Sequence, residues 1–473
     1  MHRLQLPHRV PRMKRTIRLY YSLPSGLWPI LASVQAWRLK RRRYGLIYAK
    51  ALPSIRERTR WRREQWQDFQ RRQLSEMLNR AAWLIPAYRG NPAVRARPAD
   101  PLDVLPTWPV IDIADFRTNP DRYRDPDHGF RGCITLYTSG STGTPKKIVR
   151  DSRAEQLNYA YMEARWRNLA GVNLRDRWAM LGGQLVVPAT RHQPPFWVAA
   201  YPMNQLYMSS YHLHPRNAEY YMRALRRWKP AYLLGYASSL LTLADFAEIT
   251  GILPPLKCIL SNAEPLYAHA RERLERVFGC RVFDTYGATE GAFFGFECAA
   301  GRMHISPDYG VFEILREDGT PCSPGQMGRV VVTGLTNRSM PLIRYPIGDL
   351  AAWAKDEVCG CGCTFPVIEK IEGRADDVIV LPDGRKIGRL DPVFKAELPI
   401  REAQIAQRRQ GDIEVRVVPE QRAANVSWNE QHSALLLKEL RARLGDEVPI
   451  AIRIVEQIPR GHNNKFKAVV REQ

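Results

Sequence analysis

The chain has 473 residues, which is too long for one ordinary hydrophobic core, so we expect two or more domains. Its hydrophobic fraction of 45% and charged fraction of 25% are those of an ordinary soluble protein. The net charge of +23 would suit nucleic acid or an anionic membrane surface, but no DNA- or RNA-binding motif accompanies it, so specific nucleic-acid binding is not expected. Eight cysteines without a secreted-type framework, and no signal peptide, indicate a reducing cytoplasm.

Residues 1–90 form a basic N-terminal region. An apolar stretch at residues 19–37 is flanked by Arg and Lys on both sides, but two prolines and a glycine make it a poor transmembrane helix. The stretch either rests on anionic lipid, with Trp28 and Trp37 at the interface, or packs on its own domain with its arginines pointing outward. We favour the packed arm. Residues 61–78 then predict an amphipathic helix.

Residues 91–373 alternate strand and helix patterns, which predicts an α/β core. Because ligands gather at the carboxyl ends of parallel strands, the polar residues that follow these strands are the first candidates for a site. Shorter, sequential strands at residues 309–354 predict a smaller β subdomain. The expected strands of the core lie at residues 178–183, 231–235, 257–262 and 281–286.

A loop at residues 137–147 follows an apolar strand and combines five Ser/Thr hydroxyls, two glycines and two lysines. Such a loop can wrap polyphosphate, because its backbone N–H groups turn inward while hydroxyls and lysines add donors and charge. The alternative is a solvated turn without a ligand. Pro145 disfavours a helix here, so the loop differs from the common P-loop. Its candidate phosphate contacts are Thr138, Ser139, Gly140, Ser141, Thr142, Gly143 and Lys146.

Three further polar stretches follow strands. In the first, residues 284–290, the ring of Tyr286 can stack on a purine, while Thr289 and Glu290 can reach phosphate and Mg²⁺. In the second, Asp349 can accept both hydroxyls of a ribose, and in the third Arg374 can bind ribose or phosphate. Taken singly, each of them could also be an ordinary turn or a salt-bridged loop.

The polar break at residues 374–378 predicts a hinge, and residues 379–473 predict a compact C-terminal module of the α+β type. A hairpin at residues 381–386, a strand at 413–418 and a helix at 432–444 support it. The chain closes with a basic loop that contains Lys465.

In this order and spacing, the motifs resemble those of the adenylate-forming superfamily, which includes acyl-CoA synthetases, adenylation domains and luciferases. The resemblance covers residues 80–470, and within the superfamily the chain resembles the phenylacetate–CoA ligase family. Residues 209–213, 371–377 and 388–391 resemble the branch found with capsular and exopolysaccharide biosynthesis genes. The resemblance implies a large N-terminal domain of several subdomains and a small mobile C-terminal domain.

The resemblance also implies an activity. ATP with Mg²⁺ would activate a carboxylic acid as an acyl-adenylate, and the acyl group would then pass to a thiol such as coenzyme A. Lys465 would stabilise the transition state, with Lys467 as a rival for this role, and rotation at the hinge residue Asp376 would withdraw it. The loop 138–147 would hold the β- and γ-phosphates, and Thr289 and Glu290 would bind phosphate and Mg²⁺. The remaining nucleotide contacts that it implies are Ala263, Glu264, Asp284, Tyr286, Gly287, Asp349 and Arg374.

Members of that family often carry a structural zinc ion, which directs attention to the cysteines. Three thiolates and one imidazole suffice for a closed tetrahedral zinc site. Cys363 is either a bystander or an alternative ligand, and without a metal the group would be reduced loop cysteines beside a surface histidine. The ligands favoured by the resemblance are Cys298, His304, Cys359 and Cys361.

The substrate and the acceptor stay open at this stage. An aromatic or medium-sized acid suits the family, with a pocket around residues 182–184, 207–212, Tyr236 and Ala263. The acceptor could be coenzyme A, a carrier-protein thiol, or a sugar hydroxyl or amine, and a homodimer is one of the oligomeric states left open. An inactive nucleotide-binding scaffold of a polysaccharide assembly system is the alternative function, against which the intact Glu290 and Lys465 argue.

Overall fold

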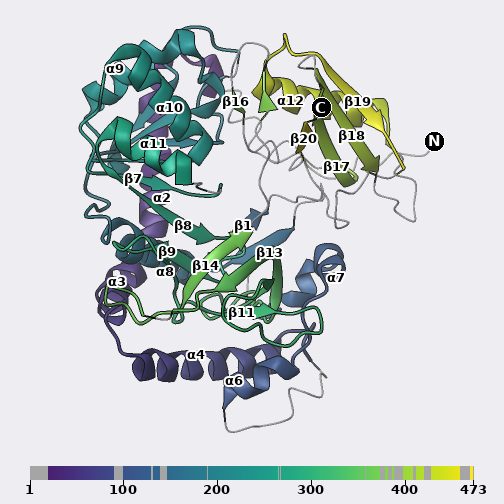
Figure 1. Ribbon diagram of the computed structural model, residues 1–473. Coiled ribbons are helices and arrows are strands. Elements are labelled where there is room, and N and C mark those ends of the chain that lie inside the picture. Colours follow the sequence, from purple (N-terminus) through teal and green to yellow (C-terminus); the bar gives the residue numbers. More distant parts are fainter. Residues whose placement is uncertain are drawn as a thin grey trace, which may run out of the picture.

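The computed structural model follows the chain from residue 20 to residue 471 (Figure 1). The residues it describes are 20–89, 100–128, 132–138, 146–188, 190–264, 266, 268–356, 358–372, 379–381, 386–387, 398–408, 412–419, 428–456, 458 and 469–471.

A 12-stranded sheet runs through the larger part of the molecule, in the order β11-β12-β13-β14-β10-β9-β8-β7-β6-β3-β5-β4 (Figure 1). Its strands are β3 (Trp178–Gly182), β4 (Trp197–Ala200), β5 (Gln205–Ser209), β6 (Tyr232–Gly235), β7 (Cys258–Ser261), β8 (Arg281–Gly287), β9 (Phe294–Glu297), β10 (Met303–Ile305), β11 (Gly310–Leu315), β12 (Gly328–Gly334), β13 (Tyr345–Trp353) and β14 (Val367–Glu372).

Strand β8 joins the parallel half of this sheet to the antiparallel half. It pairs parallel with β7, where Ser261 lies opposite Asp284, and antiparallel with β9, where Tyr286 lies opposite Gly295. Strands β3, β5, β6 and β7 continue the parallel half, so their carboxyl ends share one edge of the sheet with that of β8. The strands expected as a β subdomain form the antiparallel half of this sheet. The predicted α/β fold class is confirmed.

Helices cover both halves of the sheet. In Figure 1 helices α9, α10 and α11 lie beside the parallel half, and α4 and α6 lie below the antiparallel half. The ten helices that the structure describes are α2 (Trp28–Arg43), α3 (Leu46–Arg58), α4 (Arg63–Leu84), α6 (Pro101–Val104), α7 (Ile113–Thr118), α8 (Ser152–Met162), α9 (Ala218–Trp228), α10 (Ala237–Thr250), α11 (Ala268–Phe278) and α12 (Glu430–Leu444). Short 3₁₀ turns lie at Ser25–Leu27, Leu105–Thr107, Pro120–Tyr123, Tyr201–Met203 (η5), Ser210–His212 and Pro215–Asn217, and a π turn lies at Glu163–Arg167.

The ends of these helices follow from local chemistry. Helix α8 begins after Asp151, whose carboxylate accepts a hydrogen bond from the backbone N–H of Ala154 and so satisfies a free donor of the first turn. Helix α10 ends at Gly251, which has φ +66°, a left-handed conformation that glycine adopts without steric cost.

Helix α2 packs against the parallel half of the sheet. The backbone N–H of Tyr201 donates to Ser33 Oγ at 3.3 Å, and Lys40 Nζ donates to the Pro202 carbonyl at 2.7 Å. Trp28 is buried, so the interpretation that placed it at a lipid interface is wrong, whereas Trp37 is 50% exposed. None of the described helices is both long and apolar enough to cross a membrane.

The C-terminal part has a sheet of its own, with the order β19-β18-β17-β20. Leu436, Leu440 and Leu444 of α12 pack with Val415 and Val417 of this sheet, which gives it a separate hydrophobic core. The remaining strands are β1 (Ile134–Tyr137), β2 (Lys147–Arg150), β15 (Ile379–Val380), β16 (Lys386–Ile387), β17 (Ile400–Gln407), β18 (Ile413–Pro419), β19 (Ile450–Ile454) and β20 (Val469–Arg471).

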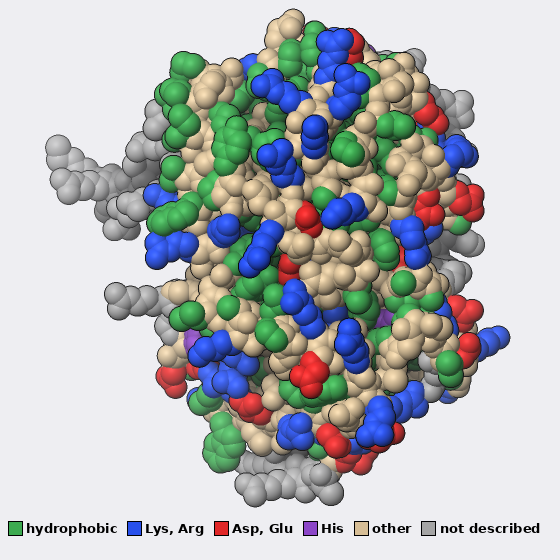
Figure 2. Space-filling view, turned by 90° about the vertical axis from the view of Figure 1, so that its left-hand side faces the viewer, with side chains coloured by type: hydrophobic (Ala, Val, Ile, Leu, Met, Phe, Trp, Pro, Cys, Tyr) green, Lys and Arg blue, Asp and Glu red, His purple; other side chains and the backbone are tan. Residues whose placement is uncertain are grey.

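Positive and negative side chains are both spread over the face shown in Figure 2. On the face shown in Figure 2, Lys and Arg side chains extend over most of the height of the molecule and are interspersed with Asp and Glu. No single basic stripe of the kind typical of nucleic-acid binding stands out among the described residues of this face.

Candidate active site

Two residues predicted to contact a nucleotide are in direct contact with each other. Tyr286, near the end of β8, donates its hydroxyl hydrogen to Asp349 Oδ2 on β13 at 2.8 Å. Its ring packs on Phe293 and Phe312, with centroid distances of 4.7 and 6.2 Å. The phenyl rings and the carboxylate therefore fix the orientation of the tyrosine ring that was predicted to cover a purine.

A second contact is a buried ion pair between Lys146 and Glu290, which follows Tyr286 in the sequence. Lys146 Nζ is 3.1 Å from Glu290 Oε1, and the Tyr345 hydroxyl donates to the same oxygen at 2.8 Å. Burial alone would raise the pKa of Glu290, but the charge of Lys146 and the two hydrogen bonds outweigh it and lower that pKa below its usual range. Glu290 is therefore an ionised carboxylate, which is a suitable oxygen ligand for Mg²⁺.

The predicted phosphate loop connects two paired strands. The Thr138 N–H donates to the Lys146 carbonyl at 3.0 Å, and the Lys146 N–H donates to Thr138 Oγ1 at 3.2 Å, so these residues hold the ends of the loop together. The loop leads into strand β2, antiparallel to β1, and not into a helix. Its central residues Ser139, Gly140, Ser141, Thr142 and Gly143 lie outside the described residues.

The turn after Tyr286 is held by Arg150 of β2. Arg150 Nη2 donates to the Thr289 carbonyl at 2.8 Å, and Nη1 lies 3.2 Å from Glu155 Oε2. A Cβ atom at Gly291 would lie 2.6 Å from Arg150 Nη2, and Gly291 has φ +64°. The left-handed backbone favours glycine at this position, and a larger residue would also displace the Arg150 guanidinium from the Thr289 carbonyl.

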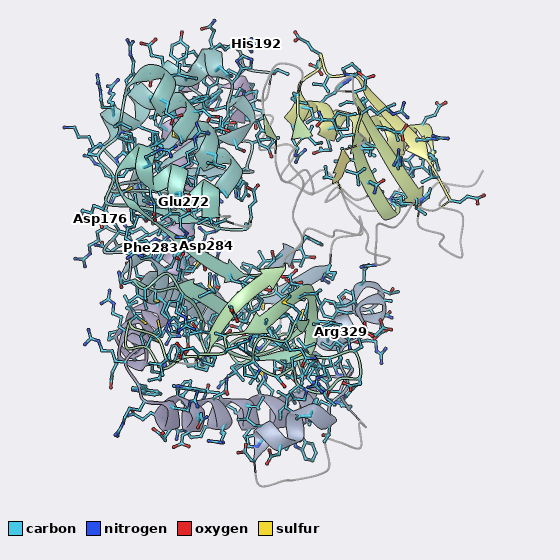
Figure 3. All side chains as sticks on the ribbon, viewed as in Figure 1. Asp176, His192, Glu272, Phe283, Asp284 and Arg329 are labelled. Atoms are coloured by element: carbon cyan, nitrogen blue, oxygen red, sulfur yellow. The ribbon has the colours of Figure 1, made fainter. Side chains whose placement is uncertain are left out.

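Polar atoms without partners lie at the carboxyl edge of the sheet. Asp284 Oδ1 and Asn262 Oδ1 are buried and have no hydrogen-bond partner among the described residues. Burial, together with the nearby Glu297 carboxylate, raises the pKa of Asp284 to about 7. Figure 3 labels Asp284 where the parallel half of the sheet meets the antiparallel half. Because buried polar groups are normally satisfied, these atoms indicate a ligand-binding edge.

The structure describes only some of the other predicted nucleotide contacts. Ala263 follows β7 and has φ +64°, a strained conformation for a residue with a Cβ and of a kind that gathers at functional sites. Glu264 and Gly287 lie on the same edge, at the ends of β7 and β8. Arg374, the hinge residue Asp376 and Lys465 lie outside the described residues, so their roles stay predictions.

Three tyrosine hydroxyls surround the turn after β3, where the acyl pocket was expected. The Gly183 N–H donates to Tyr236 Oη at 3.4 Å, and the Gln184 N–H donates to Tyr207 Oη at 3.3 Å. Tyr211 Oη donates to the Gly183 carbonyl at 2.7 Å. The turn therefore has an aromatic wall with hydroxyl groups.

The N-terminal arm holds the same turn from another side. Tyr20 Oη donates to the Val186 carbonyl at 3.1 Å, and Tyr21 Oη donates to the Leu185 carbonyl at 2.5 Å. The sequence showed the tyrosine pair but gave no signal for this contact, because the partners are 166 and 164 residues apart.

The four predicted metal ligands come together at the other end of β8 and β9. One ligand atom of each lies within 4.8 Å of the others, and the group consists of Cys298, His304, Cys359 and Cys361. His304 Nδ1 faces the Phe365 carbonyl at 2.9 Å, so Nε2 faces the thiols and lies 3.4 Å from Cys361 Sγ. This orientation of a histidine by a backbone carbonyl is usual at metal sites.

The chemistry of this group fits zinc. Burial opposes ionisation of Cys298, but hydrogen bonds from His304 and the backbone lower its pKa below the usual range, which favours the thiolate form that binds metals. Cys363 is not in the group within 4.8 Å. Its N–H donates to Cys361 Sγ at 3.4 Å, and its side chain joins the hydrophobic cluster that contains Phe365. The donor set is three sulfurs and one nitrogen.

The profile of the AMP-binding enzyme family matches residues 86–338, more than half of the chain. The chain belongs to the AMP-binding enzyme family. A second profile, for the CapK C-terminal domain, matches residues 379–472 of this AMP-binding enzyme. These matches, together with the relatives described next, confirm the predicted superfamily and its phenylacetate–CoA ligase branch.

Curated relatives cover this AMP-binding enzyme in part. It is 30% identical to Protein CapK of Staphylococcus aureus over 244 residues, which are 51% of the chain and 52% of that protein. It is 33% identical to the phenylacetate–coenzyme A ligase of Thermus thermophilus over 148 residues, 30% of the chain and 33% of that protein. It is 25% identical to the ligase of the same name from Escherichia coli K12 over 335 residues, 67% of the chain and 73% of that protein.

A solved structure shares the fold of this AMP-binding enzyme. The 2-hydroxyisobutyryl-CoA ligase, in complex with 2-HIB-AMP and CoA, superposes with a TM-score of 0.58 at 20% sequence identity. The superposition covers 88% of this chain and 92% of that one.

Proposed function

We propose that this protein uses ATP to activate a carboxylic acid as an acyl-adenylate, releasing pyrophosphate, and then transfers the acyl group to the thiol of coenzyme A. The observation that carries the proposal is the arrangement of Tyr286, Asp349 and Glu290 around the carboxyl end of β8. Membership of the AMP-binding enzyme family, and relatives named as coenzyme A ligases, support this assignment.

Each residue of the arrangement has a proposed role. The ring of Tyr286 covers adenine, and Asp349 accepts the ribose hydroxyls while it orients that ring. Glu290 and Thr289 bind Mg²⁺ and phosphate, and Lys146 neutralises Glu290 until the metal arrives. In-line attack of the acid on the α-phosphorus then depends on positioning and on stabilisation of charge, to which Lys465 contributes from the C-terminal module.

We make narrower proposals for the acid substrate, the acyl acceptor and the biosynthetic context. The aromatic wall around the turn after β3 supports an aromatic or medium-sized acid. We propose coenzyme A as the acceptor in preference to a carrier-protein thiol, a sugar or an amine, because the relatives' names support it. Similarity to CapK supports the polysaccharide-biosynthesis context that the sequence implied.

We also propose that the Cys298 group holds one structural Zn²⁺. It would link the β9–β10 turn to the loop before β14, far from the reacting groups, and supply folding free energy and not catalysis. The thiol and imidazole donors fit this ion better than Mg²⁺ or Ca²⁺, which prefer oxygen.

A hydroxylamine-trapping assay tests the ligase activity. The purified protein is incubated with ATP, Mg²⁺, hydroxylamine and a panel of aromatic and aliphatic acids, and pyrophosphate and hydroxamate are both measured. At least one acid should release pyrophosphate, and Lys465→Ala should lose this activity while Lys467→Ala keeps most of it. ATP binding without pyrophosphate release for every acid would instead favour the inactive scaffold.

A further inference from the structure

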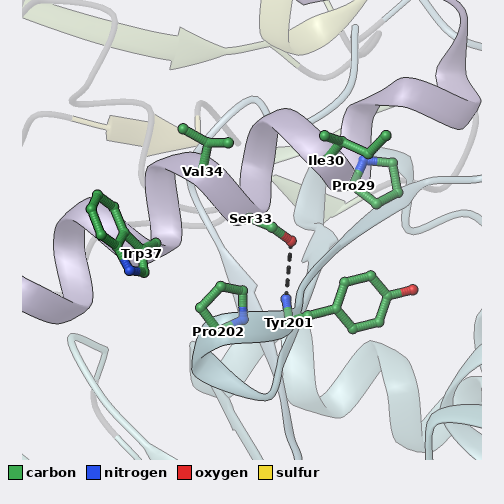
Figure 4. A pocket seen from close by; sticks show the side chains of 7 residues that line it. All are labelled: Pro29, Ile30, Ser33, Val34, Trp37, Tyr201 and Pro202. Carbon is green, nitrogen blue, oxygen red and sulfur yellow. Dashed lines mark hydrogen bonds between the residues drawn. The ribbon is translucent and has the colours of Figure 1, made fainter.

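An apolar stripe runs along the outward side of helix α2. Ile30, Val34 and Trp37 are 59%, 46% and 50% exposed, and their spacing of three to four residues places them on one side of the helix (Figure 4). Leu27 and Leu31, exposed by 42% and 39%, extend the stripe toward the start of the helix. An interior helix would bury these side chains, so the stripe is available to a partner.

The stripe borders a shallow groove that a neighbouring element completes. Tyr201 and Pro202 of η5 form its other wall, and Tyr201 is 62% exposed. The hydrogen bond from the backbone N–H of Tyr201 to Ser33 Oγ holds the two walls together (Figure 4). Trp37 and Tyr201 thus present two amphipathic rings on one surface, the residue types that concentrate at membrane–water interfaces.

The segment of the sequence that contains the stripe carries positive charges and no acidic residue. Residues 1–56 contain thirteen Lys and Arg and no Asp or Glu, and Glu57 is the first acid of the chain. Arg38 and Arg41 are exposed on α2, and Arg41 lies 4.7 Å above the ring of Trp37. Glu155, which pairs with Arg42 and Arg43, is buried and presents no carboxylate to solvent. An acid-free basic segment attracts anionic lipid headgroups.

We propose that the exposed face of α2, together with Tyr201 and Pro202, docks this protein on an anionic membrane surface. Ile30, Val34 and the two rings enter the headgroup–acyl boundary while Arg38 and Arg41 contact lipid phosphates. The aliphatic stripe favours lipid over nucleic acid, because a phosphate backbone gains nothing from Ile30 or Val34. The proposed contact is at the membrane surface, and none of the described helices is suited to spanning. This proposal does not rest on the ligase activity.

Vesicle co-sedimentation of the full chain tests the docking surface. Phosphatidylcholine vesicles with about 30% phosphatidylglycerol are compared with pure phosphatidylcholine vesicles at low and high NaCl. The wild type should bind the anionic vesicles at least about tenfold better, and high salt should weaken this binding. Equal binding to both vesicle types would overturn the proposal.

Matched variants separate the surface from general effects. The variant I30S/V34S/W37S should lose about tenfold in binding to anionic vesicles, whereas I249S/L253S/W83S, which alters exposed apolar side chains elsewhere, should not. The variant R38Q/R41Q should lose more binding to anionic vesicles than R276Q/R329Q, which removes the same charge at other exposed sites. Thermal unfolding midpoints confirm folding.

Two results would contradict the assignment. Equal losses in the test and control variants would show that total charge or apolar area acts without a specific face. Conversion of a dimer to a monomer by I30S/V34S/W37S, with unchanged vesicle binding, would assign the face to contact between copies of this chain.

Discussion

Lys146 Nζ lies 3.1 Å from Glu290 Oε1, and both side chains are buried. The pair joins the end of the predicted phosphate loop to the end of the predicted metal-binding turn, 144 residues further along the chain (290 − 146). The sequence assigned both residues to the nucleotide. The structure adds that they neutralise each other, so binding of Mg²⁺ to Glu290, as proposed above, would have to rearrange this pair.

Replacing Lys146 should destabilise the protein. Lys146→Met leaves the Glu290 carboxylate buried without its cation, which costs about 3 kcal/mol in the free energy of unfolding. The double variant K146M/E290Q should recover part of the loss, because the charge is gone. Urea unfolding measures the effect, and Lys147→Met, which removes the exposed pair with Asp121, should cost less than about 1 kcal/mol. Equal costs at 146 and 147 would contradict the burial argument.

Removing the Tyr286 hydroxyl should weaken ATP use while leaving the ring in place. Tyr286→Phe loses the 2.8 Å hydrogen bond to Asp349, worth about 1 kcal/mol, so the KM for ATP should rise about fivefold. Pyrophosphate release at varied ATP concentration measures it. Tyr123→Phe removes a similar bond to Asp115 away from the site and should leave this KM unchanged. An unaltered KM in Tyr286→Phe would argue that Asp349 is held by other groups.

If the proposed zinc site is correct, elemental analysis should find about one equivalent of zinc per chain. Cys359→Ser and Cys361→Ser should each lose the metal and lower the thermal midpoint, because the two loops are then no longer linked. Cys322→Ser, a buried cysteine of another cluster, should retain the metal. Full occupancy in Cys361→Ser would make Cys363 the fourth ligand.

Stability should depend on pH through Asp284. Its pKa is raised to about 7 in the folded protein, against about 3.9 in an unfolded chain, so the folded state binds the extra proton between these values. The contribution of Asp284 to stability is therefore complete below pH 4 and is lost as pH rises to about 7. The stability advantage of Asp284→Asn over wild type should grow across this window and then level off.

Asp318 is a matched control, because its effect on stability should change with pH in the opposite direction. Hydrogen bonds from Thr320 lower the pKa of the exposed Asp318, so its stabilising effect is present at neutral pH and is lost in acid. Urea midpoints at several pH values compare Asp284→Asn with Asp318→Asn. A constant difference between Asp284→Asn and wild type would show that Asp284 is ionised throughout.

Crowding at Gly182 tests the acyl pocket. A Cβ atom there would lie 2.2 Å from Tyr207 Oη, so Gly182→Ala must displace the tyrosine and should lower kcat/KM for the acid by at least about tenfold. The double variant G182A/Y207F should recover part of the activity, because the colliding hydroxyl is absent. Gly26→Ala, where no atom lies within 4 Å, is the control. Full activity in Gly182→Ala would place the pocket elsewhere.

Much of the local structure could be predicted from the sequence. The expected strand at 281–286 is β8, the expected helix at 432–444 lies within α12, and the expected helix at 61–78 overlaps α4. The spacing of hydrophobic residues in a strand or a helix depends on residues close together in the sequence, so it can be recognised without knowing the fold. The four cysteine and histidine side chains that the family resemblance favoured as metal ligands lie together in the structure, whereas the residues alone had left Cys363 open as an alternative.

The partners of the site residues could not be predicted. No sequence pattern predicted that the Tyr345 hydroxyl donates to Glu290 or that Arg150 donates to the Thr289 carbonyl. These pairs are 55 and 139 residues apart, and spacing along the chain carries no information on such contacts. For the same reason the sequence left two positions open for Trp28, a packed arm or a lipid interface, since only packing decides which face of α2 is buried.

The sequence by itself determined the family motifs, their order and the chemical types that a nucleotide and a zinc ion require, because these depend on residue identity and local backbone freedom. Only the tertiary structure decided which charges neutralise each other, which hydroxyls fix the turn after β3, and which apolar side chains of α2 stay exposed. Those outcomes depend on burial and on distances between segments far apart in the chain, and both arise when the sheet assembles.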